Sequence, residues 1–270
     1  MYKTTPMHGI IPRIAGYLQH RLKARSKYDI HSPFAYRFYK EVLKNKEVPS
    51  SCREIEKLLS RLKNDPGYIC MTDFGAGSKE SPLCRKVTRI NRMVRRSSVS
   101  QKYGRLLFRI ARELQPGVVL EFGTSLGIST AYLAAGAPES MVTTIEGCEQ
   151  TAALARKNFE SLGLANVRVI GSRFEDVLSY LLPELGVVDL VFFDGDHRRD
   201  STLLYFESCL PFITDHTVFV FDDIHWSEEM EQAWEEIRKR ESVRVTIDLY
   251  RMGIVFFREG LAKEDFILRF

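Results

Sequence analysis

The sequence predicts an α/β fold: a doubly wound, mostly parallel sheet of seven strands, whose last hairpin is antiparallel, with an N-terminal helical cap. From about residue 116 onward, apolar runs of β type alternate with helical patterns, which is typical of βαβ units. The last two runs, VRVTIDLY and GIVFFR, have only Arg251 and Met252 between them. So short a link permits only an antiparallel hairpin. Residues 1–110 lack the alternation.

Each predicted element has its own pattern. Buried or half-buried strands are expected at 118–122, 141–146, 166–171, 187–194 and 217–223. Helices are expected at 128–137, 151–163, 174–182, 201–210 and 227–240. The last of these helices has acids first and bases last, as the helix dipole prefers. Helices on both faces of a parallel sheet follow from this order.

The first 110 residues predict helices without a second core. Residues 10–29 have apolar side chains at helical spacing with bases on the other face, and residues 51–64 repeat the pattern. A helix at 101–114 leads directly into the first strand. We therefore expect a basic helical cap at 1–110, a Rossmann-like domain at 111–260 and a C-terminal tail at 261–270.

Composition places the chain among ordinary globular proteins. It has 270 residues, of which 44% are hydrophobic and 27% charged, enough for one large core. No apolar run approaches the roughly 18 residues of a membrane span, and the basic, prolyl opening does not resemble a secretory signal. Five scattered cysteines without C-x-x-C spacing indicate reduced thiols. A cytoplasmic location is expected.

The charge is unevenly distributed. Residues 1–109 contain 24 Lys and Arg against 8 Asp and Glu, and the remainder contains 15 against 27. Either the first part packs on the acidic second part, or it meets an anionic partner, or it is a solvated basic face. RNA and an anionic membrane surface are the partners that such a cap would suit.

Two glycine stretches compete for a ligand-binding role. A glycine turn binds a cofactor in this architecture when it joins a buried strand to a packed helix. "TDFGAGSK" at 72–79 precedes a polar, basic segment, so residues 73–78 are expected to be a loop bordering the site. "LEFGTSLGIST" at 120–130 precedes an apolar helix. The second stretch is therefore the predicted site.

The residues of this turn indicate a cationic ligand. Glu121 ends the strand where a phosphate-binding turn would avoid a carboxylate, and the G-x-G-x-x-G spacing of dinucleotide folds is missing. Gly123 and Gly127 let a ligand approach the backbone closely. Glu146 ends the next strand, where an acid can accept both hydroxyls of a ribose. A ligand with an amino-acid amine and a sulfonium fits these groups.

On these residues, the segment from about 100 to 258 resembles the class I S-adenosylmethionine-dependent methyltransferases, whose first motif is similar to E-F-G-T-S-L-G-I-S. The resemblance implies that Glu121 and its turn hold the methionine part of S-adenosylmethionine and that Glu146 holds the ribose. Ser125 stands where glycine is commonest, a departure that the catechol-type branch tolerates. Gly171 and Ser172 would border the adenine. The expected cofactor-binding residues are Glu121, Gly123, Thr124, Ser125, Gly127, Glu146, Gly147, Ser172 and Asp194.

Three carboxylates are predicted at the same edge of the sheet. Asp194 ends one central strand, and Asp222 and Asp223 end the next. If the strands are adjacent, their ends lie about 5 Å apart. Repulsion among the carboxylates must be relieved by protonation or by a cation, and oxygen ligands suit Mg²⁺ or Ca²⁺. Alternatively, Asp222 or Asp223 caps the following helix and Asp194 touches the cofactor.

The D-G-D…S-T…D-D pattern is similar to metal-dependent O-methyltransferases of the macrocin type and, more distantly, to catechol O-methyltransferase. This resemblance implies Asp194, Asp222 and Asp223 as metal ligands and Asp196 as the base for the substrate hydroxyl. His197 falls where the catechol-type enzymes place a catalytic lysine. The sequence departs from these patterns after His197, where two arginines follow, and at Asp223, where catechol-type sites often have asparagine.

The expected activity is methyl transfer from S-adenosylmethionine to a hydroxyl of a small molecule, with or without the assistance of Mg²⁺. Amino-methylating nucleic-acid enzymes carry an (Asn/Asp)-Pro-Pro-aromatic motif after the fourth strand, and here that strand ends in D-G-D-H. An RNA- or lipid-directed methyltransferase that uses the basic cap stays open as an alternative. A dinucleotide oxidoreductase is disfavoured by the missing glycine spacing. The sequence does not determine an oligomeric state.

Overall fold

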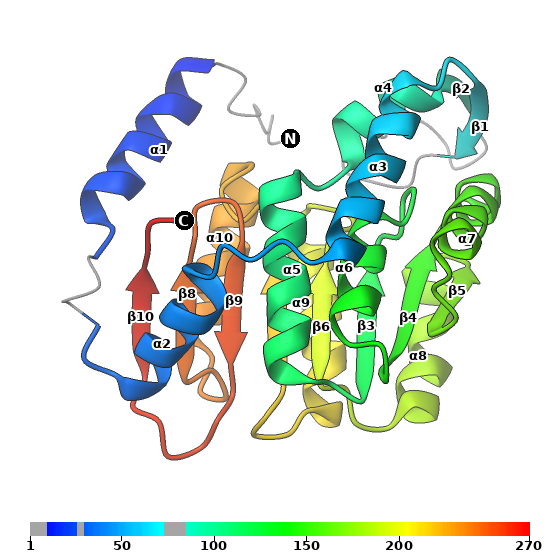
Figure 1. The fold of residues 1–270 in the computed structure, drawn as a ribbon. Helices are drawn as coiled ribbons and strands as arrows, with labels where there is room; N and C mark the ends of the chain where they lie inside the picture. The colour runs from blue at the N-terminus through cyan, green and yellow to red at the C-terminus, as the bar shows by residue number, and fades with distance from the viewer. Residues whose placement is uncertain (1–9, 26–29, 73–84) are drawn as a thin grey trace, which may run out of the picture.

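The computed structural model describes residues 10–25, 30–72 and 85–270 and contains a central eight-stranded sheet (Figure 1). The spatial order of its strands is β10-β8-β9-β7-β6-β3-β4-β5. The strands are β3 (Val118–Phe122), β4 (Met141–Glu146), β5 (Val167–Gly171), β6 (Leu190–Phe193), β7 (Val218–Phe221), β8 (Val245–Asp248), β9 (Gly253–Phe256) and β10 (Glu264–Ile267).

The predicted fold class is confirmed. Strands β3 to β7 are parallel to one another, and β9 pairs antiparallel with both β7 and β8. One correction concerns the strand count: the segment predicted as a C-terminal tail contributes β10, which lies parallel to β8. Phe266 and Leu268 are buried and alternate with more exposed residues. This period-two pattern is too short to distinguish from a tail in the sequence.

Helices cover both faces of the sheet. One face carries α8, α9 and α10, whose apolar side chains meet those of Leu120, Phe122 and Phe193 in one core. The other face carries α5, α6 and α7 together with part of the cap, in a second core. The helices are α5 (Gln101–Leu114), α6 (Ile128–Gly136), α7 (Glu149–Leu162), α8 (Phe174–Leu185), α9 (Arg199–Cys209), η3 (Leu210–Phe212) and α10 (Glu228–Lys239).

The N-terminal cap shares the core of the sheet. Phe34 and Phe38 make edge-to-face contacts with Phe256 of β9, at 5.0 and 5.1 Å between ring centroids. The cap also contains an antiparallel hairpin, β1 and β2, that the sequence did not predict. Its elements are α1 (Ile10–Lys23), α2 (Pro33–Phe38), the π-helix η2 (Tyr39–Leu43), α3 (Ser50–Asn64), β1 (Tyr68–Thr72), β2 (Arg85–Arg89) and α4 (Ile90–Ser97).

Several sequence-based expectations fall at the margins of the structure. Residues 73–78 of the first glycine stretch lie outside the described residues, as do Tyr28 and Cys84. The four cysteines that are described, Cys52, Cys70, Cys148 and Cys209, are free thiols. In the described part of the chain, no helix combines the length and the apolar character needed to span a membrane.

Candidate functional site

The turn after β3 is held tightly against the neighbouring strand ends. The backbone amides of Gly123 and Thr124 donate hydrogen bonds to the carbonyl of Ile145, at 3.0 and 3.2 Å. Gly123 has a φ of +97°, and a Cβ there would lie 2.4 Å from the carbonyl oxygen of Asp194. Only glycine fits both the conformation and the space. The turn therefore brings the β3 motif into contact with the residue that follows β6.

Glu121 is completely buried beneath this turn. Its Oε2 accepts hydrogen bonds from the hydroxyls of Thr130 and Thr144. Its Oε1 has no hydrogen-bond partner among the described residues. Burial raises the pKa of Glu121 to about 7, although nearby hydroxyl groups oppose the shift. A buried carboxyl with one free oxygen is costly unless something that the structure does not contain, such as an ammonium group, completes it.

Glu146 and Ser125 hold the other side of the turn. Glu146 accepts hydrogen bonds from the backbone amides of Ser125 at 2.8 Å and Cys148 at 3.0 Å. Ser125 has a φ of +47°, which explains why glycine is common at this position. Its hydroxyl is hydrogen-bonded to that of Ser97, at the end of α4, over 2.8 Å. The cap thus reaches the glycine turn directly.

A hollow lies between the turn and the cap. Serine and threonine side chains dominate its lining, which consists of Ser97, Ser98, Val99, Thr124, Ser125, Leu126, Ile128 and Ser129. Gly127 begins α6 with a φ of +79°, where a Cβ would lie 2.4 Å from the Phe159 ring. The first amides of α6 and these hydroxyls suit a carboxylate group.

The remaining predicted cofactor residues lie at the ends of neighbouring strands. Glu146 is paired with Gly171 across β4 and β5. Gly147 follows Glu146, and Ser172 follows Gly171, so both leave the sheet at the same edge as the β3 turn. Each of the two is partly exposed.

The acidic residues after β6 and β7 come together as the sequence predicts, because these strands are adjacent. Burial raises the pKa of Asp194, and the charges of Asp222, Asp223 and Glu121 raise it further, while Arg251 opposes them. Asp222 is fully buried, and both of its oxygens accept hydrogen bonds from Arg251, at 3.0 Å from Nε and 2.7 Å from Nη2.

The predicted metal ligands, Asp194, Asp222 and Asp223, are not arranged around a common point. Within 10–25, 30–72 and 85–270, no group of three or more His, Cys, Asp or Glu side chains is placed to hold a metal ion. The guanidinium of Arg251 occupies the carboxylate of Asp222 and lies 3.5 Å from Asp223 Oδ1. The three aspartates therefore do not fit a shared divalent cation while Arg251 is in this position.

The two predicted catalytic residues differ in their surroundings. Asp196 has a φ of +47°, and both of its oxygens accept hydrogen bonds from the guanidinium of Arg198, at 2.5 and 2.8 Å. His197 places its Nε2 3.7 Å from Oδ1 of Asp194, and a quarter of its side chain is exposed. His197 is thus the more accessible of the two, and its imidazole lies near the carboxyl of Asp194.

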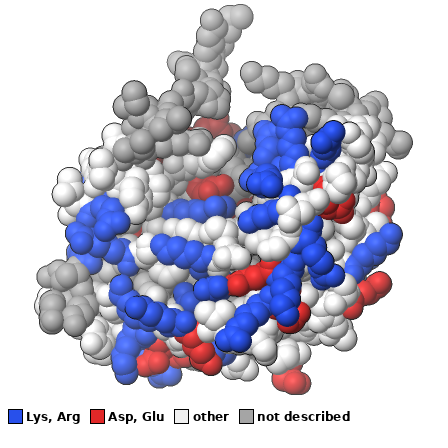
Figure 2. Space-filling view, turned by 45° about the horizontal axis from the view of Figure 1, so that its top comes forward, with Lys and Arg blue, Asp and Glu red and all other residues white. Residues whose placement is uncertain are grey.

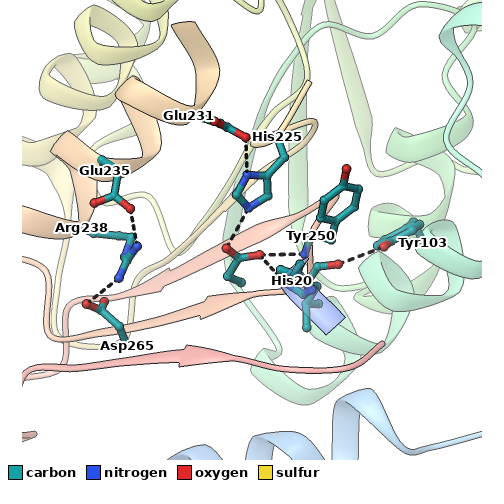
Figure 3. Close-up of polar contacts among 10 residues, drawn as sticks. His20, Tyr103, His225, Glu231, Glu235, Arg238, Tyr250 and Asp265 are labelled. Carbon is teal, nitrogen blue, oxygen red and sulfur yellow. Dashed lines mark hydrogen bonds and ion pairs between the residues drawn. The ribbon is translucent and has the colours of Figure 1, made fainter. Parts of the chain in front are cut away.

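A further polar network fixes the β8–β9 link (Figure 3). Asp248, at the end of β8, is hydrogen-bonded to His20 of α1 and to His225, each at 2.9 Å. His225 also contacts Glu231 at 3.1 Å. Burial alone would lower the pKa of His225, but the bonds to Asp248 and Glu231 outweigh it and raise the pKa to about 9. Helix α1 and the link that bears Arg251 are thereby joined.

The surface above the strand ends is charged but mixed. Figure 2, which brings the top of Figure 1 forward, shows many Lys and Arg side chains with acidic ones between them. Some of the cap's bases are paired with acids, as Arg105 is with Glu56 at 2.6 Å. Among the aromatic residues that an RNA strand would stack on, Phe34 and Tyr39 pack against the core. Tyr36, by contrast, is exposed, and the RNA or membrane partner stays a prediction.

Comparison with known proteins addresses the family. The family described as "Methyltransferase domain" matches residues 120–224, a stretch that begins just before Glu121 and ends just after Asp223. Residues 120–224 are therefore similar to this methyltransferase domain. Both the glycine turn and the acidic residues after β6 and β7 lie inside that match.

Curated relatives of the methyltransferase domain agree with this assignment. The catechol O-methyltransferase of Mycobacterium tuberculosis is 34% identical over 131 residues, which cover 48% of this chain and 58% of that protein. The transmembrane O-methyltransferase homolog of Mus musculus is 34% identical over 174 residues, which cover 60% and 62%. The chain therefore spans about 60% of the length of the curated relatives it matches.

Solved structures show the same fold. The O-methyltransferase from Bacillus cereus, in complex with SAH, superposes with a TM-score of 0.54 at 21% identity, covering 82% of this chain and 96% of that one. The O-methyltransferase TomG from Streptomyces achromogenes, in complex with SAM, gives 0.53 at 24%, covering 60% and 82%. At these identities the likeness concerns the architecture of the methyltransferase domain alone.

Sequence reasoning missed two contributions to the site. Ser97 and Ser98 were part of an unassigned stretch, and only the serine pair before the 101–114 helix could have drawn attention to them. Arg251 was read as a linker residue. A charged residue in a hairpin link beside a run of acids was the available signal, but its partner Asp222 is 29 residues away in sequence.

Proposed function

We propose that this chain is an S-adenosylmethionine-dependent methyltransferase that transfers a methyl group to a hydroxyl of a small molecule. The observation that carries the proposal is the buried carboxyl of Glu121, whose Oε1 lacks a partner beneath the glycine turn. An ammonium group at this point would satisfy the oxygen and favour the ionised carboxylate. The names of the curated relatives, which are O-methyltransferases, support the hydroxyl as acceptor.

Different residues of the chain would contact different parts of the cofactor. Gly123, Thr124 and Ser125 would contact the methionine part, together with Gly127, the N-cap residue of α6. Glu146 and Gly147 would contact the ribose, while Ser172 would border the adenine. The backbone carbonyl of Asp194 lies against Gly123, and its carboxyl would lie near the sulfonium. When bound, the cofactor supplies a methyl group on a positively charged sulfur.

The acceptor hydroxyl must lose its proton as the methyl group reaches its oxygen. Asp196 and His197 are the two predicted bases. The Arg198 guanidinium already binds both oxygens of Asp196, whereas His197 is partly exposed and directed at Asp194. We therefore assign to His197 the role of accepting this proton, with Asp194 orienting the imidazole. Proximity of the two reactants supplies much of the remaining rate enhancement.

Calorimetric titration with S-adenosylhomocysteine tests the cofactor site. This compound retains the ammonium group, so Glu121→Gln should weaken binding at least tenfold. Exposed Glu160 on α7 offers a matched control, and Glu160→Gln should bind as the wild type does. Because the free carboxyl has a pKa of about 7, binding at pH 6 should release up to one proton from the wild type and none from Glu121→Gln. A folded wild type that does not bind the compound contradicts the proposal.

A further inference from the structure

The acidic residues after β6 and β7 need a positive charge, and the structure already supplies one. Asp222 is buried, and Asp194 and Asp222 directly follow the paired last residues of the adjacent parallel strands β6 and β7. Such a group of acids is stable only if protons or a cation offset their repulsion. The resemblance to metal-dependent enzymes predicts a divalent metal for this role, and the geometry disagrees.

Arg251 binds the carboxylate in the manner that excludes a metal. Its Nε and Nη2 approach the two oxygens of Asp222 at 3.0 and 2.7 Å, a parallel, two-point contact. Nε also lies 3.5 Å from Asp223. A metal ligated by Asp222 would need the same oxygens at roughly 2.0–2.6 Å, directly beside another cation. The pKa of Arg251 is raised by these acids, although burial opposes the rise, so the guanidinium stays charged.

The arginine is held in place by the rest of the fold. The carbonyl of Arg251 accepts a hydrogen bond from the amide of Ile224 at 3.1 Å. The preceding residue, Tyr250, donates its amide to Asp248 at 2.7 Å. The Tyr103 hydroxyl donates to the carbonyl of Leu249 at 3.2 Å, and its ring lies 5.7 Å from the guanidinium carbon. The link is thus fixed at three successive positions, 249 to 251, and its backbone holds Arg251 next to Asp222.

We propose that Arg251 takes the place of a divalent metal in this chain and that the acidic edge works without one. The arginine offsets the charge of Asp222 and lies beside Asp223, and it leaves no metal ion to lower the pKa of the acceptor hydroxyl. Deprotonation then depends on the chain's own base. The inference concerns metal binding itself, so it stands or falls separately from the proposed methyl transfer.

Titration of the apo protein with Mn²⁺, Mg²⁺ and Ca²⁺, followed by calorimetry and thermal shift, is the test. The wild type, stripped with EDTA, should show no saturable binding up to millimolar metal. Arg251→Met removes the charge at similar length and should acquire saturable binding, with a midpoint at least tenfold below the highest concentration tested. Adding Asp222→Asn to this variant should abolish the gain.

A matched control separates this site from arginine loss in general. Arg238 is paired with Asp265 at 3.0 Å on another part of the sheet, and Arg238→Met should gain no metal response. Equal responses of wild type and folded Arg251→Met, whether both bind metal or neither does, overturn the proposal. If Arg251→Met does not fold, metal binding by the wild type is the test. Saturable binding that Asp222→Asn removes refutes the inference, and the absence of saturable binding supports it. S-adenosylhomocysteine binding, measured in EDTA, reports separately on the proposed function.

Discussion

The β3–α6 turn and the β8–β9 link are two polar regions at the same edge of the sheet, but they are built differently. The turn is contiguous, since residues 121 to 130 supply its acid, its glycines and its helix start. The link gathers Asp222, Asp248, Arg251 and two histidines from distant parts of the chain. The methyltransferase domain match covers the turn and ends before the link. The acidic residues Asp222 and Asp223 thus lie within the matched domain, whereas the arginine that pairs with Asp222, Arg251, lies C-terminal to it.

Removal of Arg251 should give the largest effect on the β8–β9 link. Arg251→Met leaves Asp222 buried without its partner, which should lower the free energy of unfolding by about 3 kcal/mol or more. Urea unfolding measures the loss. Asp222→Asn in the same chain should recover most of it, because the buried charge of Asp222 is then removed as well. A loss below about 1 kcal/mol would mean that the pair is only a surface contact.

The turn should respond in the opposite direction. Glu121 is destabilising when ionised, since its pKa is about 7 in the folded protein and near 4.5 when unfolded. Stability therefore falls as pH rises from about 4.5 through 7, and Glu121→Gln removes that dependence. Above pH 8 the variant should be more stable by up to about 3 kcal/mol, and below pH 4 equal to the wild type. Chemical denaturation at several pH values checks this, and a pH-independent difference contradicts it.

The pH dependence of stability at His225 tests the β8–β9 link. The pKa of His225 is raised to about 9, so the stability it contributes is complete below about 6.5 and is lost as pH rises through 9. The wild type should exceed His225→Gln by about 2 kcal/mol at pH 6, and the gap should close by pH 10. Thermal unfolding of both proteins across this range measures it. A gap that widens above pH 8 has the wrong sign.

The smallest expected effect concerns Ser125, where backbone strain and the hydrogen bond to Ser97 can be measured separately. Ser125→Ala keeps the left-handed conformation and loses the hydrogen bond to Ser97, so it should cost about 1 kcal/mol. Ser125→Gly loses the same bond but relieves the backbone, so its stability should stay within about 0.5 kcal/mol of the wild type. Equilibrium unfolding of the two variants side by side decides. Equal losses would show that the conformation at 125 is unstrained.

The same contrast explains what the sequence could predict. The alternation of strands and helices, the choice of the second glycine stretch and the meeting of Asp194 with Asp222 and Asp223 all depend on local patterns and on strand adjacency. The role of Arg251 depends on how a hairpin folds back on β7, and no spacing encodes that. The hairpin β1–β2 and strand β10 were missed for a related reason, because short edge strands with polar residues carry little periodic signal. The assigned roles of Asp196 and His197 stay predictions.

Strand β10 has a practical consequence for handling the protein. It pairs with β8 along residues 264–267, and the amide of Arg25 donates to the carbonyl of Ile267 at 2.8 Å on its outer side. Cutting the chain after residue 260 would bare the row of amides and carbonyls on β8, a template on which other copies can assemble into aggregates. Affinity tags are therefore better attached beyond Phe270 through a flexible spacer than substituted for the last ten residues.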